Sequence, residues 1–196
     1  SLDYVVLTSV DRDDLTDGGS SHIAKCVDAS KRKSPNVVIE VLSPDFRGNL
    51  DHLDILLESG LDVFSQNIET VERLTHPVRD PRAGYKQTLK MLRHASEKSF
   101  LSKSGMMLGL GEEKDEVIKT MRDLHDCGVK ILTIGQYLRP TINHLPVKKY
   151  IHPDEFLEYS DIGMEIGIEE VVAGPLIRSS YRADRAFMKI EKNKNG

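Results

Sequence analysis

The sequence contains little cysteine, and this scarcity excludes several classes of protein. Only two cysteines occur among 196 residues, Cys26 and Cys127, and neither belongs to a Cys-x-x-Cys pair. A disulfide framework is therefore excluded, and we expect a reducing compartment, the cytoplasm or, in a eukaryote, the mitochondrial matrix. The seven histidines are scattered without a His-x-x-x-His spacing, so no zinc site built from protein ligands alone is expected.

Long apolar runs and concentrations of one charge are also missing. No run approaches the length of a membrane span, and the sequence does not begin with the pattern of a secretory signal. The 27 basic residues are outnumbered by 31 acidic residues, which gives a formal net charge of -4, and they form no stripe. We therefore expect neither a membrane nor a nucleic acid as a partner.

Short apolar runs alternate with segments of helical periodicity. The composition, 39% hydrophobic and 30% charged, is that of a globular protein with one domain. Strands are predicted at Tyr4–Val10, Val37–Leu42, Asp62–Gln66, Ser102–Leu108, Ile131–Tyr137 and Glu170–Ala173, and helices at Ser21–Lys33, Leu50–Ser59, Tyr85–Lys98, Lys114–Cys127 and Pro153–Ile166. Because the strands are apolar throughout, the pattern indicates an α/β fold, with a parallel sheet covered on both faces or a barrel.

Polar clusters follow nearly every predicted strand. They are Ser9–Asp14, Asp45–Gly48, Asn67–Glu69, Gly109–Glu112, Gln136–Pro140 and Arg178–Tyr181. In a parallel α/β fold the loops after the carboxyl ends of the strands meet at one edge, and active sites are built there. The clusters therefore predict a functional site at that edge.

Glycines interrupt the strand that leads into the fourth of these clusters. Gly105 and Gly109 leave the backbone without Cβ atoms, so a flat ligand can approach it closely. Glu112 comes where a helix follows, so a simple strand-to-helix turn explains the same residues. Both interpretations stay open at this point.

Asn67 and Glu69 are two residues apart after an apolar strand, so they face the same side of the chain. An amide beside a carboxylate can bind a ribose diol or an amino group, and an Asx turn with an exposed acid is the alternative. Lys103 falls inside a strand, where a lysine is rarely buried without a partner. We expect Lys103 to face the polar site or to pair with an acid.

Two further clusters have ordinary explanations. The acids of Asp11–Asp14 are suitable ligands for a hard cation, but Arg12 stands among them, and a salt-bridged loop is favoured. The segment Arg178–Tyr181 fits a helix cap or a turn. A serine hydrolase is not indicated, because the sequence has no Gly-x-Ser-x-Gly motif.

In this order, the clusters resemble the lipoyl synthase family of the radical S-adenosylmethionine (SAM) superfamily. The matching segments include Tyr4–Asp14, Asp45–Gly48, Asn67–Val71, Gly105–Glu112, Thr133–Leu138, His144–Val147 and Arg178–Asp184. The resemblance extends from Leu2 to Phe187. It implies a partial six-strand (β/α) barrel, in which the first five predicted strands are the second to the sixth and Glu170–Ala173 is an added strand.

The resemblance also implies a reaction and its cofactors. Two sulfur atoms are inserted at C6 and C8 of an octanoyl chain on a lysine of a carrier domain, which makes the lipoyl cofactor. The family uses SAM and two [4Fe-4S] clusters, one that cleaves SAM reductively and one that is the sulfur source. The implied partners are the lipoyl domain of a 2-oxoacid dehydrogenase or the H protein of glycine cleavage, and an electron donor such as ferredoxin or flavodoxin.

Site residues follow from the same resemblance. It implies that SAM is bound by residues of several clusters, namely Ser9, Asn67, Glu69, Lys103, Gly109, Glu112 and Gln136. It implies that Ser180 is a serine ligand of the auxiliary cluster, with Ser179 as the second choice, and that Arg178 lies beside this cluster and the substrate. An alkoxide is a hard ligand among thiolates and is more easily displaced. No catalytic residue is assigned.

The sequence departs from the family in its cysteines. The family carries a Cys-x3-Cys-x2-Cys set and a Cys-x4-Cys-x5-Cys set before the segment that matches Tyr4, and the sequence has neither. We therefore expect a C-terminal part of such an enzyme, inactive alone, with a partial barrel in residues 1–186 and a flexible tail in residues 187–196. The alternatives are a non-catalytic module that binds SAM or a carrier domain, and an unrelated barrel lyase with Lys103 as a Schiff-base amine.

Overall fold

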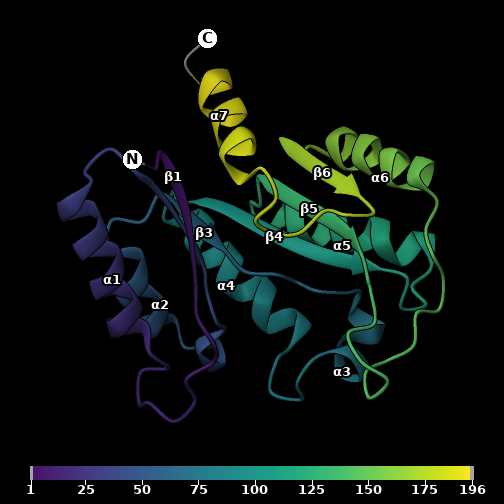
Figure 1. Ribbon diagram of the computed structural model, residues 1–196, viewed down its shortest axis with the longest axis horizontal. Helices are drawn as coiled ribbons and strands as arrows, with labels where there is room; N and C mark the ends of the chain where they lie inside the picture. Colours follow the sequence, from purple (N-terminus) through teal and green to yellow (C-terminus); the bar gives the residue numbers. More distant parts are fainter. Residues whose placement is uncertain (1, 195–196) are drawn as a thin grey trace.

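Six parallel strands form one open sheet, and their order in the sheet is their order in the sequence (Figure 1). The computed structural model describes residues 2–194. The strands are β1 (Tyr4–Thr8), β2 (Val38–Leu42), β3 (Val63–Ser65), β4 (Leu101–Leu108), β5 (Ile131–Gln136) and β6 (Glu170–Gly174). The helices are α1 (Ser20–Lys33), α2 (Leu50–Leu57), α3 (Thr75–Val78), α4 (Tyr85–Glu97), α5 (Lys114–Asp126), α6 (Pro153–Ile166) and α7 (Ala183–Lys194), with 3-10 turns at Phe46–Gly48 and Glu72–Leu74.

The predicted α/β fold with a parallel sheet is confirmed. Every predicted strand and helix is present, and each ends within two residues of its predicted bounds. The strand predicted as an addition to the barrel continues the same sheet, because β6 pairs in parallel with β5 along its whole length. The short helix α3 was not predicted, because a single turn that contains Pro77 is too short to show helical periodicity.

Local sequence explains where the helices begin and end. In α5 the side chains of Glu113 and Glu116 form a capping box that binds the free amides of the first turn. Val117 and Met121 recur at helical spacing and form part of its buried face. The chain leaves the helix at Gly128, which has a φ of +82° that favours glycine.

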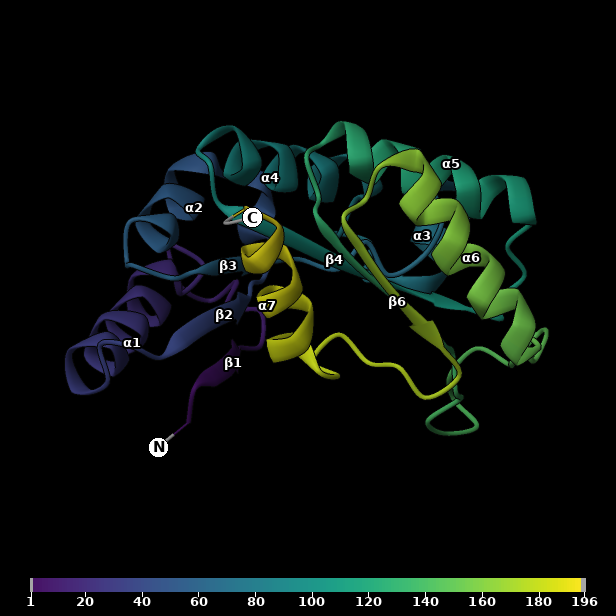
Figure 2. The ribbon, with the colours of Figure 1, turned by 90° about the horizontal axis from the view of Figure 1, so that it is seen from above.

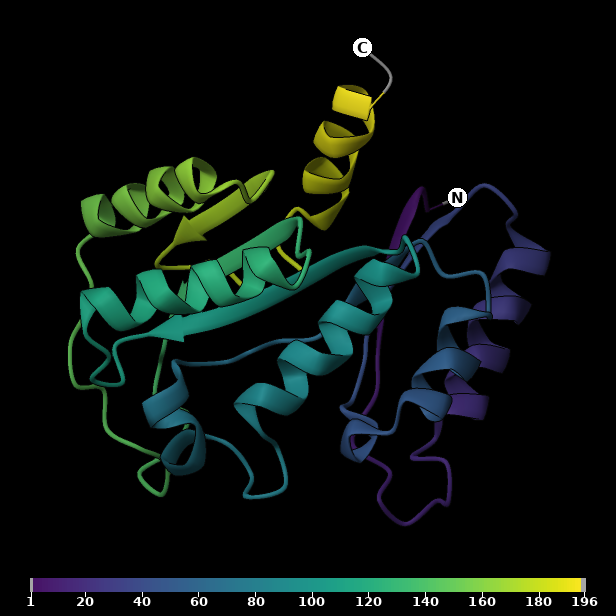
Figure 3. The same cartoon turned by 180° about the vertical axis from the view of Figure 1, so that it is seen from behind.

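Five helices pack on the outer, convex face of the sheet (Figure 2, Figure 3). These are α1, α2, α4, α5 and α6, and the largest apolar core lies between them and the strands, around residues such as Leu56, Phe64 and Leu132. None of the helices within residues 2–194 has both the length and the apolar character required to cross a membrane.

Helix α7 lies alone on the concave face of the sheet (Figure 2). Its residues Ala186 and Ile190 are buried in a second apolar cluster with β3, β4 and β5. The ring of Phe187 packs edge to face on Tyr4 of β1, with ring centroids 5.9 Å apart. Where a frayed tail was expected after residue 186, the chain is helical as far as Lys194 and packs on the sheet; residues 195–196 lie outside the described part.

The inward side chains of β4 divide the concave face into layers. Residues two apart on a strand face the same side, so Leu101, Lys103, Gly105 and Met107 follow one another along this face. Leu101 belongs to the cluster with α7, Lys103 is buried in an ion pair, and Gly105 and Met107 line a cavity. The amino-terminal half of the concave face is thus filled, and the carboxyl-terminal half is open to a ligand.

The packing of α7 gives a prediction for stability. Replacing Ile190, which is 1% exposed, by alanine is expected to lower the free energy of unfolding by about 2–4 kcal/mol, because it leaves a cavity inside the sheet. On the same helix Met188 is half-exposed, so Met188→Ala is expected to cost no more than about 0.5 kcal/mol. Urea unfolding followed by circular dichroism measures both. Equal losses for the two variants would contradict the docking of α7 on the concave face.

Candidate functional site

Two neighbouring cavities open at the carboxyl ends of the strands, and Asn67 and Glu69 line both of them. The first, of about 130 Å³, is bounded by β4, β5 and the segment after β6, with Gly105, Met107, Thr133, Gly135, Ile177, Arg178 and Ser179 in its wall. The second, of about 380 Å³, is bounded by the loops after β1, β2 and β3, with Ser9, Asp11, Asp45, Gln66 and Arg79 in its wall. Both cavities therefore lie at the edge where the polar clusters meet.

The backbone of Glu69 is fixed by two hydrogen bonds to β4. Its amide donates to the carbonyl oxygen of Gly105 at 3.0 Å, and its own carbonyl oxygen accepts from the amide of Met107 at 2.9 Å. The φ of Glu69 is +67°, a left-handed conformation that a residue with a side chain keeps only when its surroundings enforce it. The enforced turn keeps the carboxylate in the wall of both cavities.

Burial of Glu69 changes its acidity. Removal from water raises the pKa of its carboxyl group, while a hydrogen bond from Asn67 and the positive charge of Arg79 lower it, and the net effect is a raised pKa. Since a ligand hydroxyl donates to an ionised carboxylate, a bound donor would stabilise the charged form of Glu69.

Several buried polar atoms at the cavities have no partner among the described residues. Gln66 is 2% exposed, yet neither its Oε1 nor its Nε2 makes a hydrogen bond, and the same is true of Asn67 Oδ1. Buried polar atoms are nearly always paired in proteins, because an unpaired one loses its hydration without compensation. Unpaired amides beside a cavity therefore favour a polar ligand that completes their hydrogen bonds.

Beside the first cavity, β4 and β5 carry glycines at inward positions where other parts of the chain come close to the strands. A Cβ atom on Gly105 would lie 2.7 Å from Thr133 Oγ1 and 2.8 Å from Asn67 Oδ1, so a side chain at this position would displace both. A Cβ on Gly135 would collide with the carbonyl oxygen of Ile177, because the segment after β6 lies directly on β5. At Gly105 the missing Cβ thus makes room for Thr133 and Asn67, while Glu112 binds the amides of the strand-to-helix turn at Gly109 and Leu110.

The segment Arg178–Tyr181 crosses the concave side between β6 and α7, as Figure 2 shows for the yellow connection. Arg178 and Ser179 line the first cavity. Ser180 is exposed and lines a separate hollow of about 350 Å³ beside Tyr4 of β1. The late segment therefore returns to the open face of the sheet, and its two serines face different hollows.

Two of the residues predicted to bind the cofactor, Glu112 and Gln136, hold loops together instead of lining a cavity, and a third, Gly109, is one of their backbone partners. The carboxylate of Glu112 accepts from the amides of Gly109 at 2.5 Å and Leu110 at 2.9 Å. Gln136 Nε2 donates to the carbonyl oxygen of Lys149 at 3.2 Å, and its Oε1 accepts from the amide of Ile151 at 2.9 Å. These side chains fix the loops after β4 and β5, so any contact they make with a ligand runs through the backbone they position.

Lys103 does not reach either cavity. It is 1% exposed, and its Nζ lies 2.9 Å from both carboxylate oxygens of Glu40. The hydroxyl of Tyr4 donates to the same carboxylate at 2.6 Å, and burial together with the charge of Glu40 raises the pKa of Tyr4. Of the two expectations for Lys103, pairing with an acid is confirmed. The ammonium is thus unavailable for a cofactor or for Schiff-base chemistry.

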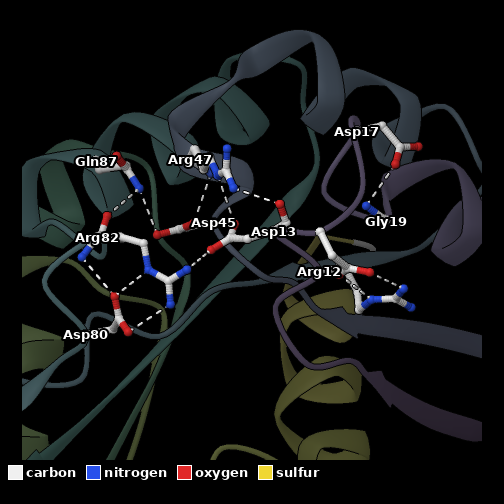
Figure 4. Close-up of polar contacts among 10 residues, drawn as sticks. Arg12, Asp13, Asp17, Gly19, Asp45, Arg47, Asp80, Arg82 and Gln87 are labelled. Atoms are coloured by element: carbon white, nitrogen blue, oxygen red, sulfur yellow. Dashed lines mark hydrogen bonds and ion pairs between the residues drawn. The ribbon is translucent and has the colours of Figure 1, made fainter.

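A network of ion pairs joins three loops at the rim of the second cavity (Figure 4). Asp13, after β1, accepts from Arg47 Nε at 3.0 Å and also from Arg82, which precedes α4. Gln87 of α4 donates to Asp45 Oδ2 at 2.7 Å. The interpretation of Asp11–Asp14 as a salt-bridged loop is confirmed, and the network holds the rim that Ser9 and Asp45 line.

Several cavity residues were not among the predicted site residues. Four whose side chains bear on the site are Gln66, Arg79, Thr133 and Ile177. Gln66 directly precedes Asn67, and a glutamine at the end of an apolar strand is a signal that could have identified it. The other three give no local signal, because they reach the cavities only through the register of the strands and the path of the connecting loops.

Within residues 2–194, no three His, Cys, Asp or Glu side chains converge as ligands for a metal ion. Cys26 is exposed on α1, and Cys127 is buried beside Arg93 after α5. Both belong to the helical layer on the convex face. The described residues therefore do not fit an iron–sulfur cluster by themselves.

A protein-family model and several curated proteins match this chain. The family model described as the Radical SAM superfamily matches residues 1–124. A lipoyl synthase of Ectopseudomonas mendocina is 58% identical over 100% of this chain and 56% of its own length. One of Marinobacter nauticus is 57% identical over 96% of this chain and 55% of its own, and one of Thermus thermophilus is 57% identical over 94% and 58%. The chain thus spans little more than half the length of these curated relatives.

Solved structures with a similar fold are distant in sequence. Methylornithine synthase has a TM-score of 0.60 at 14% identity, over 98% of this chain and 67% of that chain. The HMG-CoA lyase from Brucella melitensis has a TM-score of 0.53 at 13% identity, over 86% and 58%. At such identities the likeness concerns the fold alone.

The buried pair of Lys103 and Glu40 gives a prediction. Lys103→Met leaves the carboxylate of Glu40 without its cation and is expected to lower the free energy of unfolding by about 3–5 kcal/mol. Adding Glu40→Gln removes the stranded charge, so the double variant is expected to recover most of the loss. Lys114 pairs with Glu158 on the surface, so Lys114→Met serves as a control with an expected cost below about 1 kcal/mol. If Lys103→Met and Lys114→Met unfold at the same urea concentration, the prediction that the folded state depends on the pair of Lys103 and Glu40 is contradicted.

The raised pKa of Glu69 gives a second prediction. A carboxyl with a higher pKa in the folded than in the unfolded chain contributes stability below its unfolded pKa, ordinarily 4.5, and loses that contribution as pH rises through the folded pKa. Glu69→Gln cannot ionise, so it is expected to be more stable than the parent at pH 7, and the difference is expected to vanish below pH 4.5. Urea unfolding of Glu69→Gln and of the parent, from below pH 4.5 to pH 7, measures the difference in the free energy of unfolding. A variant less stable than the parent at pH 7 contradicts the prediction.

Proposed function

The chain belongs to the radical SAM superfamily, and from this premise we propose that it is the part of a lipoyl synthase that binds SAM and faces the substrate. The main observation in support is the pair of cavities at Asn67 and Glu69, which have unpaired buried amides in their walls. Arg178 and Ser179 of the Arg178–Tyr181 segment line the first cavity. The identity of 57–58% to lipoyl synthases supports the assignment within the superfamily. Because the chain spans little more than half of these relatives, the activity of the whole protein is part of the proposal.

The residues at the cavities fit SAM. Asn67 and Glu69 are placed to hydrogen-bond the two ribose hydroxyls, since an amide and a carboxylate side by side complement a diol. Gly105 and Gly135 line the first cavity, in which the flat adenine ring is proposed to lie. When bound, SAM supplies the group that abstracts hydrogen from the substrate. The chain orients that group, and the apolar wall at Met107 and Ile177 keeps water from it.

The second cavity provides for the charged end of SAM. Gln66 has free donor and acceptor atoms there, and Ser9 and Asp45 add further polar groups. An amino-acid group needs both acceptors for its ammonium and donors for its carboxylate, and this wall contains both. We therefore assign the adenosine part to the first cavity and the amino-acid part to the second.

The proposal extends to two [4Fe-4S] clusters, although the described residues do not supply their thiolates. Among the described residues of the concave face, the ligand that we propose is the hydroxyl of Ser180 beside β1. Arg178 lies next to it on the same segment and is placed to meet an anionic group. No step of the reaction is derived through the clusters. The electrons would come from a partner such as ferredoxin or flavodoxin.

The proposed substrate is an octanoyl chain on a lysine of a carrier domain, and the proposed product carries sulfur at C6 and C8 of that chain. Met107 and Ile177 in the first cavity give an apolar surface on which an alkyl chain can lie. The carrier is proposed to be the lipoyl domain of a 2-oxoacid dehydrogenase or the H protein of glycine cleavage.

A second candidate function is a non-catalytic module that binds SAM or a carrier domain. The observation in its favour is that the described residues contain the cavities but no set of thiolates. Analysis of iron and acid-labile sulfide in the product of the complete gene, after anaerobic reconstitution, separates the two functions. Two clusters per chain support the enzyme, and their absence supports the binding module.

The function is tested with the product of the complete gene, reconstituted anaerobically and supplied with SAM, a reductant and an octanoyl-lysine peptide. Mass spectrometry is expected to show a peptide that has gained two sulfur atoms. Asn67→Ala removes hydrogen bonds to the ribose and is expected to weaken SAM binding, measured by calorimetry, about tenfold. Asn36 is exposed at the opposite, amino end of β2, so Asn36→Ala is expected to bind like the parent.

Two results would count against the proposal. A reconstituted parent protein that leaves the peptide unchanged contradicts the lipoyl synthase activity. Equal SAM affinity of Asn67→Ala and Asn36→Ala contradicts the placement of the ribose, even if the parent is active.

A further inference from the structure

The loop between β5 and α6 presents a surface that the proposed cofactor site does not use. We call residues 138–152 the rim loop. It contains one arginine, two lysines and two histidines but no aspartate or glutamate, in a chain with a net charge of -4. It also exposes four large apolar side chains, Leu138, Ile142, Leu145 and Tyr150, of which Ile142 is 82% and Tyr150 72% exposed. One such residue is ordinary on a surface, but four in one loop mark a contact site.

The rim loop is held in one shape before any partner binds. The hydroxyl of Tyr137 donates to the carbonyl oxygen of Leu145 at 2.9 Å, and Arg139 Nε donates to that of His144 at 2.8 Å. The amide of Lys148 donates to the carbonyl oxygen of Gly109 at 2.8 Å. A surface that is already ordered loses little conformational entropy on binding, so its apolar side chains can act as anchors.

The positive charge of the rim loop is only partly neutralised. Lys149 pairs with Glu155 at 2.7 Å. Arg139 donates to backbone carbonyl oxygens of its own loop, and neither it nor Lys148 forms an ion pair with a carboxylate within residues 2–194. The loop therefore has uncompensated positive charge, which is complementary to an acidic surface.

The position of the rim loop relates it to the cavities. It begins where β5 ends, next to Gln136, and is tied through Lys148 to Gly109 at the end of β4. Figure 2 shows this green loop projecting on the same side of the sheet as α7 and the segment after β6, which closes the first cavity. A partner seated on the rim loop would thus lie beside the edge at which the cavities open.

We propose that the rim loop docks the protein domain that carries the acylated lysine, through an acidic face of that domain with an apolar patch. The inference rests on the proposed function: a substrate attached to a protein brings a protein surface to within one lysine arm of the cavities. Ile142 and Tyr150 supply the apolar anchors, and Arg139 and Lys148 supply the charges that select an acidic partner. This gives the described chain a share in choosing the carrier, apart from the chemistry in the cavities.

Binding and turnover test the docking separately. The product of the complete gene is titrated with a purified carrier domain without its octanoyl chain, and turnover is measured with the short octanoyl-lysine peptide. Ile142→Glu and Lys148→Glu are each expected to weaken binding of the domain about tenfold, because they place a carboxylate against an acidic face. Their turnover of the peptide is expected to match the parent, since a short peptide does not need the docking surface.

Matched controls lie on the convex, helical side of the molecule. Leu157 of α6 is 61% exposed and Lys86 of α4 is almost fully exposed, so Leu157→Glu and Lys86→Glu introduce the same charges elsewhere. If the rim-loop variants bind the domain as tightly as these controls, the docking proposal is overturned. The docking proposal is also overturned if the rim-loop variants change only self-association or binding to lipid vesicles. Absence of peptide turnover in the parent refutes the proposed function instead. The titration with the carrier domain then still shows whether the rim loop docks that domain.

Discussion

The ion pair between Lys103 and Glu40 lies in the middle of the concave face and separates a filled half from an open half. Toward the amino ends of the strands, α7 closes the sheet with Ile190 and Phe187. Toward the carboxyl ends, Gly105 and Met107 line the first cavity. A buried charge is tolerated only with a partner of opposite sign, so Lys103 and Glu40 fix each other and also the spacing of β2 and β4. The first cavity begins at the next inward position of β4, at Gly105.

The open half is shaped by backbone pairing more than by side-chain packing. Glu69 is held on β4 by two backbone hydrogen bonds and takes a left-handed conformation that keeps its carboxylate at the cavities. Asp13 and Asp45 tie the loops after β1 and β2 to the start of α4. A site whose walls are fixed in this way leaves polar atoms such as those of Gln66 unpaired, because no side chain can move in to satisfy them. The same rigidity prepares them for a ligand.

The edge of the sheet combines two kinds of surface with different tasks. The first cavity is small and lined by glycines, and the second is lined by polar loop residues, which together suit a nucleoside-like cofactor. The rim loop is broad, basic and apolar, which suits a protein. Both are positioned by the ends of β4 and β5, since Gln136 and Gly109 hold the rim loop while Gly105 and Gly135 line the first cavity. The proposed cofactor site and the proposed docking surface for a carrier are thus built on the same two strands.

The sequence determined the elements of this protein, because apolar runs and helical periodicity are local properties. The strand and helix bounds, the parallel sheet and the edge that bears the cavities could all be predicted from it. Asn67 and Glu69 could be identified as well, because their alternation places both on one side of the chain. The order of the strands then brings their loops together without further information.

Only the tertiary structure decided the rest. The partner of Lys103 is 63 residues away, and the register of three strands selects it. Glu112 and Gln136 resemble cofactor ligands in the sequence, but the loop path gives their side chains to backbone groups. The lysine-rich tail becomes α7 because a concave face remains to be filled. Each of these depends on which distant surfaces meet, and no local pattern of residues encodes that geometry.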